Sequence, residues 1–170
     1  MIVQGRTLAA QGQVEEGIAQ MRQGLTAWRA LGVKTAVPYF LAMLAEAYGA
    51  CGQAAEGLLQ LTEALAVIHD TGEQYQEAEV HRLKGELLLQ QDLSDALQAE
   101  ACFQQALAIA RCQQAKSWEL RAAISLSRLW QQQGKRDEAR ALLAPIYSWF
   151  TEGFDTADLQ EAKALLEALA

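Results

Sequence analysis

Few residues of this chain have the type and spacing that chemistry requires, and its two histidines are the first to consider. His69 and His81 fall in different predicted helices, and neither has a His, Cys or carboxylate partner at the spacing of a metal-ligand set. Glu77 and Glu79 lie near His81 but do not complete such a set. We therefore predict no metal site, and we expect both histidines to be ordinary surface or interhelical residues.

The glycine, serine and cysteine residues form no recognisable catalytic or redox motif. The chain has no GxxxxGK[ST], GxGxxG or GxSxG sequence, so neither a phosphate-binding loop nor a nucleophile elbow is predicted. Cys51, Cys102 and Cys112 include no CxxC pair, and the last two are too far apart on one predicted helix to form a disulfide. Reduced thiols favour a cytoplasmic protein. We expect no catalytic residue and no cofactor.

The carboxylates and tryptophans have structural explanations. Glu77 and Glu79 could serve as an acid–base pair, but carboxylates of this kind are better explained as solvated helix faces. Many of them have a basic partner one turn away, as in the pairs Glu79–Arg82 and Arg82–Glu86. The tryptophans are expected to pack in the core; they are Trp28, Trp118, Trp130 and Trp149.

The composition is that of a folded helical chain. It is 51% apolar and contains only two prolines, and alanine and leucine are far more abundant than β-branched residues. The net charge is −7 and the chain has no run of Lys and Arg, which makes it a poor candidate for nucleic-acid binding. No apolar stretch of about 18 residues is present, so no membrane span is predicted. The first residues do not form a secretory signal.

A recurring sequence pattern of small residues marks the helices that would position any site. Gly12, Gly52, Asp92 and Gly134 begin related segments, each spanning the end of one helix and the start of the next. Markers inside these segments recur at spacings of 40, 42 and 40 residues; they are Gly24, Ala64, Ala106 and Ile146. Glycine suits the left-handed conformation at a helix end, and Gly32 and Gly72 are predicted to end the second helices in the same way. The Asp92 turn holds two extra residues.

Matched small and large residues predict how the helices pack. Small residues allow close approach within each helix pair, and large residues at other matched positions fill the core. The small residues are Ala45, Gly85 and Ser127 in the first helices and Gly17, Gly57, Ala99 and Ala139 in the second helices. The large residues are Met21, Leu61, Phe103 and Leu143 in one set and Tyr48, Leu88 and Trp130 in another.

The two prolines have different expected effects. Pro38 fits the first turn of a helix, where its missing N–H is not needed. Pro145 follows two leucines inside the last second helix, so a kink or an early end with a restart is expected there.

The small–large–small pattern resembles the tetratricopeptide repeat (TPR). The segments that carry the resemblance are Lys84–Leu88 and Ala99–Leu107, although the unit is longer than the usual period of about 34 residues. The longer unit, with the segments Ala115–Ala123 and Leu143–Leu159, resembles the C-terminal arrays of large bacterial signalling proteins. Those proteins contain a nucleotide-switching ATPase module and often a nucleotidyl-cyclase or helix-turn-helix output domain. The resemblance implies a non-catalytic module that binds a partner.

The predicted fold is all-α, a right-handed superhelical α-solenoid of antiparallel helix pairs forming one TPR-like domain. Its expected units are 1–32, 33–72, 73–115 and 116–153, followed by a capping helix over 155–169 in which Asp155 and Asp158 form the N-terminal cap. By repeat alignment the first helix should begin before Met1. The chain is therefore expected to be a fragment or a shortened descendant, with residues 1–11 frayed or buried against another copy.

The first helices of such an array line a concave groove, which is the predicted binding surface. Its expected partner is a protein or an extended peptide, or else a small effector. The candidate residues are Tyr39, Glu46, Glu79, Arg82, Glu86, Arg121 and Arg128. Two alternatives stay open: these charges form only intrahelical pairs, or the module assembles with itself as a homodimer through its N-terminal helix.

Overall fold

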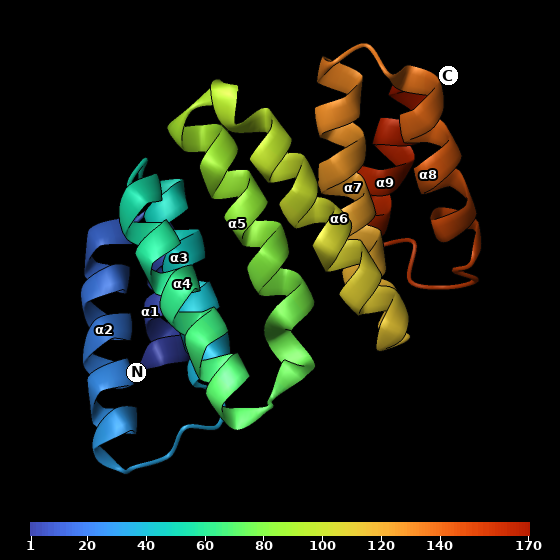
Figure 1. The fold of residues 1–170 in the computed structure, drawn as a ribbon. Helices are drawn as coiled ribbons and strands as arrows, with labels where there is room; N and C mark the ends of the chain where they lie inside the picture. The colour runs from blue at the N-terminus through green and yellow to red at the C-terminus, as the bar shows by residue number, and fades with distance from the viewer.

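The computed structural model describes all residues 1–170 and contains nine α-helices and no strands, with 81% of residues helical (Figure 1). Two short 3₁₀ turns, η1 (Gln74–Gln76) and η2 (Leu93–Asp95), precede α5 and α6. The all-α prediction is confirmed. The helices are α1 (Ile2–Ala10), α2 (Val14–Ala30), α3 (Val37–Ala50), α4 (Ala54–Thr71), α5 (Glu77–Gln91), α6 (Ala96–Cys112), α7 (Lys116–Gln132), α8 (Arg136–Ser148) and α9 (Ala157–Ala168).

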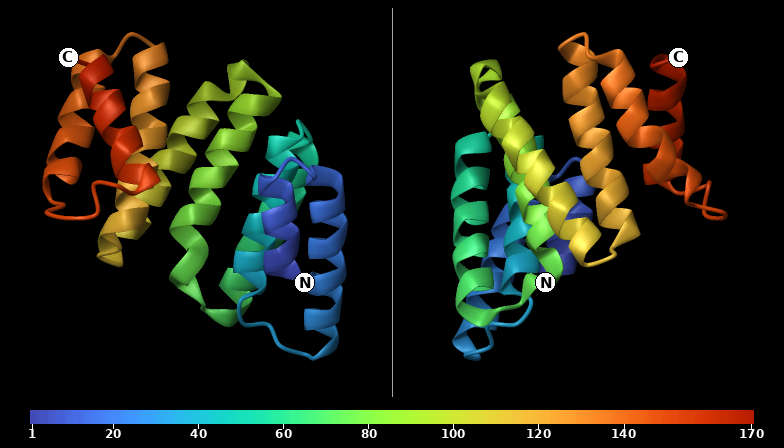
Figure 2. Two further views of the ribbon diagram at one scale, coloured as in Figure 1. Left: turned by 180° about the vertical axis from the view of Figure 1, so that it is seen from behind. Right: turned by 45° about the vertical axis from the view of Figure 1, so that its right-hand side comes forward.

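Successive helices form antiparallel pairs that stack into a right-handed superhelical solenoid, as predicted. The pairs are α1–α2, α3–α4, α5–α6 and α7–α8, and α9 packs against both helices of the last pair. The first helices of neighbouring pairs also pack together, α1 on α3, α3 on α5 and α5 on α7. Figure 2 shows the side of the array on which α1 and α9 lie. The helices α1, α3, α5 and α7 therefore form one continuous inner face.

Glycines end the helices where the repeat pattern predicted them. Gly12 and Gly52 follow α1 and α3 with φ of +91° and +75°, a conformation that other residues adopt only at a cost. The third unit differs, because its turn contains η2, in which the Asp92 carboxylate accepts a hydrogen bond from the Ser94 backbone N–H at 2.8 Å. The two extra residues of this turn are thus accommodated as a 3₁₀ turn.

The predicted small residues lie where paired helices touch. A Cβ atom added at Gly17 would stand 2.5 Å from the backbone oxygen of Gly5, so α1 and α2 meet backbone to backbone. In the last pair, the Ser127 hydroxyl donates to the Ala139 backbone oxygen at 3.2 Å. The large residues of the first predicted set are all buried, with relative exposures of 1%, 0%, 1% and 0% for Met21, Leu61, Phe103 and Leu143. In the second set Tyr48 and Leu88 are buried and Trp130 is half-buried. The predicted packing is confirmed.

Two expectations about the C-terminal part are wrong, and a third is met in part. Helix α8 has no restart after Pro145, but it ends early, at Ser148, three residues later. Helix α9 begins at Ala157 with Thr156 as its N-cap and no side-chain capping bond, so Asp155 does not cap it. Trp149 is 58% exposed and belongs to no core cluster, because it lies just past the end of α8.

The N-terminal helix is short, with no side-chain cap, but it is packed. Ile2 and Gly5 of α1 are buried, and Ile2 lies against Gly24 of α2. Val3 is 64% exposed. Fraying of residues 1–11 stays a prediction. No helix of the chain combines the length and apolar character that a membrane crossing requires.

Candidate functional site

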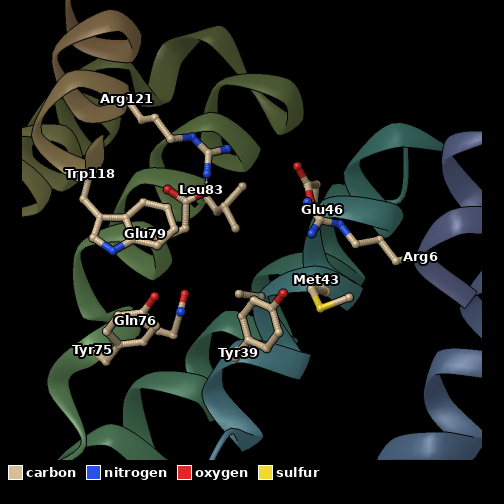
Figure 3. Close-up of a pocket in the computed structure, with 11 residues that line it drawn as sticks. Arg6, Tyr39, Met43, Glu46, Tyr75, Gln76, Glu79, Leu83, Trp118 and Arg121 are labelled. Carbon is tan, nitrogen blue, oxygen red and sulfur yellow. Dashed lines mark ion pairs between the residues drawn. The ribbon is translucent and has the colours of Figure 1, made fainter. Parts of the chain in front are cut away.

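A cavity of about 250 Å³ opens on the inner face, between α1, α3, α5 and α7 (Figure 3). Its residues come from the first helix of every pair and from η1, so stacking of all four units builds it. Its volume lies just below the range of about 300 to 1,000 Å³ that is typical of ligand pockets. The lining residues are Arg6, Tyr39, Ala42, Met43, Glu46, Tyr75, Gln76, Glu79, Leu83, Trp118 and Arg121.

The structure brings four of the seven predicted groove residues to this cavity and places the other three elsewhere. The four that line it are Tyr39, Glu46, Glu79 and Arg121. Arg82 is only 6% exposed, and its guanidinium binds the Glu86 carboxylate and the Ser125 hydroxyl between α5 and α7. Arg128 lies farther along α7, where it pairs with Glu161 of α9 at 2.8 Å.

Glu79 is the centre of a buried ion network, which corrects its expected place on a solvated helix face. It is 6% exposed and accepts hydrogen bonds from Arg82 of its own helix at 2.8 and 2.9 Å. Arg121 of α7 reaches the same carboxylate at 2.9 Å. The predicted pairs Glu79–Arg82 and Arg82–Glu86 exist, but the network also joins two repeats.

The electrostatics of Arg82 follow from its burial. Burial by itself disfavours the charged guanidinium, but the carboxylates of Glu79, Glu86 and Glu46 outweigh it. The net result is that the pKa of Arg82 is raised above its ordinary value. Arg82 is therefore a permanently charged residue that supports the cavity from behind.

The charges that line the cavity are balanced. At the α1 end, Arg6 pairs with Glu46 of α3 at 3.5 Å, and both side chains are about half exposed. At the α7 end, Arg121 pairs with Glu79, and its guanidinium carbon lies 5.4 Å from the centroid of the Trp118 ring. Two arginines thus face two carboxylates, and the site has no strong preference for either sign of charge.

Sequence reasoning missed three residues that shape the cavity, namely Tyr75, Gln76 and Trp118. Gln76 is 5% exposed and lines the cavity, and its side-chain amide makes no hydrogen bond within the chain. Figure 3 shows it between Tyr75 and Tyr39, with Trp118 nearby. The residues were detectable, because Gln76 and Trp118 each lie one turn before a predicted groove residue of the same helix face. Trp118 had been expected to pack in the core.

The exposed face of the first pair is more polar than the faces that pack inside the array. Met43, Leu44 and Ala47 of α3 are buried in a cluster with residues of α1 and α2. By repeat alignment their counterparts on α1 are Val3, Gln4 and Thr7, all exposed. This surface gives no support to the hypothesis that the chain forms a homodimer through its N-terminal helix.

Comparison with known proteins identifies the fold. No protein-family model matches the chain, and no curated protein sequence is significantly similar to it. Among solved structures, the chain is similar to nearly identical TPR-like repeats of a protein described as a kinesin light chain from Podosopora anserina. That match has a TM-score of 0.71 and 21% identity over 99% of this chain and 82% of the other.

A second structure of those repeats, a variant with a single substitution, gives the same result. It matches with a TM-score of 0.69 and 20% identity over 99% of this chain and 90% of the other. The fold is a TPR-like array. At these identities the likeness concerns the fold alone.

Proposed function

We propose that this chain is a non-catalytic interaction or effector-sensing module that binds a protein or peptide partner, or a small effector, on its inner face. The observation that carries the proposal is the amide of Gln76, which lines the cavity and has no hydrogen-bond partner in the chain. Each hydrogen bond that a ligand made to this amide would contribute about 0.5–1.5 kcal/mol. We propose that the array that presents it consists of units 1–32, 33–72, 73–115 and 116–153, closed by α9.

The walls of the cavity support binding of an extended segment. The amide of Gln76 offers both a donor and an acceptor, which matches the N–H and C=O of one residue in an extended chain. Tyr39, Tyr75 and Trp118 supply aromatic surface for a flanking side chain. The balanced pairs Arg6–Glu46 and Arg121–Glu79 can exchange partners with charged groups of the ligand at either end.

The test is selection of ligands from a random heptapeptide display library, followed by calorimetry on the selected peptides. Replacing Gln76→Leu keeps the volume of the side chain but removes the amide, and we expect the affinity to fall by about tenfold, the value of one or two hydrogen bonds. Gln105→Leu, on the exposed face of α6, is the matched control and should bind as the wild type does.

Far-UV circular dichroism would establish that the variants keep the wild-type helix content. Two results would overturn the proposal: selection that enriches no peptide, or selected peptides that bind wild type and Gln76→Leu equally. A small effector that binds to wild type and loses affinity in Gln76→Leu would support the same site.

The cellular context belongs to the proposal as well. The segments Ala115–Ala123 and Leu143–Leu159 resemble the ends of arrays in bacterial signalling ATPases, so we place the module in a cytoplasmic signalling protein of that kind. The neighbouring coding sequence tests this directly, because it should encode an ATPase module with an output domain. An unrelated neighbour would contradict the assignment without affecting the binding site.

A further inference from the structure

Two grooves between successive second helices occupy equivalent places in the array. The first, of about 370 Å³, lies between α2 and α4, and the second, of about 270 Å³, lies between the end of α6 and α8. By repeat alignment, Arg111 and Lys116 of the second groove stand where Arg29 and Lys34 stand in the first. Each groove therefore presents an arginine and a lysine at matched positions.

In the first groove the chain itself neutralises both cations. Arg29 pairs with Glu63 and Lys34 pairs with Asp70, each at 2.5 Å, and both carboxylates come from α4. The charged residues that line this groove are these four. Its two positive charges are matched by two negative charges from α4.

The second groove lacks these carboxylates. Pro145 of α8 stands at the position of Glu63, and Glu152, at the position of Asp70, lies beyond the end of α8 and makes no ion pair. Arg111 and Lys116 both turn instead to one carboxylate, Glu119 of α7, at 2.9 and 2.7 Å. Glu119 is buried, whereas Arg111 is half exposed and Lys116 is about one-third exposed. Two cations thus share one buried carboxylate.

An exposed indole lies beside these cations. Trp149 is 58% exposed, and the Lys116 ammonium lies 5.6 Å from the centroid of its ring. Leu142, Pro145 and Ile146 supply the apolar wall of the groove. In a chain with a net charge of −7, this groove combines a surplus positive charge with uncovered apolar surface.

We propose that the groove between α6 and α8 is a second binding site, which takes an acidic peptide segment. A carboxylate of the peptide pairs with Arg111 and Lys116, as Glu63 and Asp70 do in the first groove. A neighbouring apolar side chain of the peptide packs on Trp149. The partner therefore supplies the negative charge that the first groove obtains from α4 of the chain itself. This site is separate from the inner-face cavity and does not depend on it.

The test uses the peptide acetyl-Leu-Glu-Leu-Glu-amide, with acetyl-Leu-Gln-Leu-Gln-amide as its neutral counterpart. Binding is followed by NMR through the indole N–H signal of Trp149, assigned by its loss in Trp149→Phe. We expect the acidic peptide to shift this signal saturably and the neutral peptide to bind at least tenfold more weakly. Raising the salt concentration should weaken binding of the acidic peptide.

One substitution converts the second groove into a copy of the first. Pro145→Glu places a carboxylate where Glu63 stands and removes a proline from a helix interior, so the fold should be retained. We expect it to reduce binding of the acidic peptide at least tenfold. The double variant Arg29→Gln/Lys34→Gln in the first groove is the matched control and should leave binding unchanged.

Several results would overturn the proposal. They are equal shifts with both peptides, no shift with either peptide, the same saturable shift with sodium acetate, and unchanged binding in Pro145→Glu. Loss of binding in the first-groove control would show that the peptide binds elsewhere. Binding to Gln76→Leu should remain, which separates this site from the inner-face cavity.

Discussion

At the scale of single residues, the closest contacts in the array depend on glycines, which have no side chain. Gly5 and Gly17 bring α1 and α2 together so closely that a Cβ at Gly17 would also lie 2.8 Å from the Ala9 backbone nitrogen. Glycine inside a helix ordinarily costs about 0.5–1 kcal/mol relative to alanine. The presence of Gly17 in the first turn of α2 is explained by the packing of the pair.

The substitution Gly17→Ala should therefore destabilise the protein, although alanine has a better helix propensity than glycine. The nearest atoms are backbone, which cannot move without separating the helices, so we expect a loss of about 1–3 kcal/mol in the free energy of unfolding. Urea unfolding followed by circular dichroism measures it. Gln23→Ala, exposed on the same helix, is the control and should change stability by about 0.5 kcal/mol or less. A neutral or stabilising Gly17→Ala would contradict this packing.

Residue-level prediction from sequence succeeded where the repeat constrains a position and failed where another repeat decides it. The small residues could be predicted from the repeat, because the two helices of every pair contact each other in the same way. Glu79 was placed in solvent because only its own helix was considered. Its burial depends on Arg121 of α7, which lies forty-two residues later in the chain and pairs with the Glu79 carboxylate.

At the scale of the helices, the pairing could be predicted but the ends of the last helices could not. The recurrence of Gly12 and Gly52 fixes where a first helix stops, and stacking follows from the apolar faces. Pro145 was expected to kink α8 or to end it early with a restart. The helix ends at Ser148, three residues after the proline, and does not restart. Whether a helix stops there depends on how the chain turns toward α9, which no local signal encodes.

His81 of α5 should make the stability of the protein depend on pH. Burial lowers the pKa of His81 below its ordinary value of 6.5, and the nearby positive charge of Lys84 lowers it further. As the pH falls, the unfolded chain therefore binds this proton before the folded chain does. The contribution is fully present above about pH 6.5 and is lost as the pH falls through the folded value.

The expected result is that wild type loses more stability than His81→Gln between about pH 7.5 and about pH 5.5. Urea unfolding at the two pH values measures both losses, and the difference between the proteins isolates His81 from the other titrating groups. Equal losses in the two proteins would show that burial does not shift this histidine.

At the scale of the whole molecule, the core is built in overlapping clusters and a buried polar network crosses the middle of the array. One cluster extends from α2 to α5 and another from α5 to α9, so α5 belongs to both. On the inner face of α5, Arg82 joins Glu79 and Glu86 of its own helix to Ser125 of α7. This network links the third unit to the fourth directly beneath the proposed binding cavity.

Removing Arg82 should affect the whole array, because it leaves two carboxylates without their shared partner. Breaking a buried ion pair by removing one member costs about 3–5 kcal/mol, whereas an exposed pair contributes about 0–1 kcal/mol. We expect Arg82→Met to lower the free energy of unfolding by about 3–5 kcal/mol. Arg128→Met should lower it by about 1 kcal/mol or less, because Arg128 is half exposed in its pair with Glu161. Both residues were predicted groove residues, so the comparison also tests their different roles. Thermal and urea unfolding measure the difference. If Arg82→Met were as stable as Arg128→Met, the network would have no structural role, and Arg82 would be free to act as a ligand-binding residue.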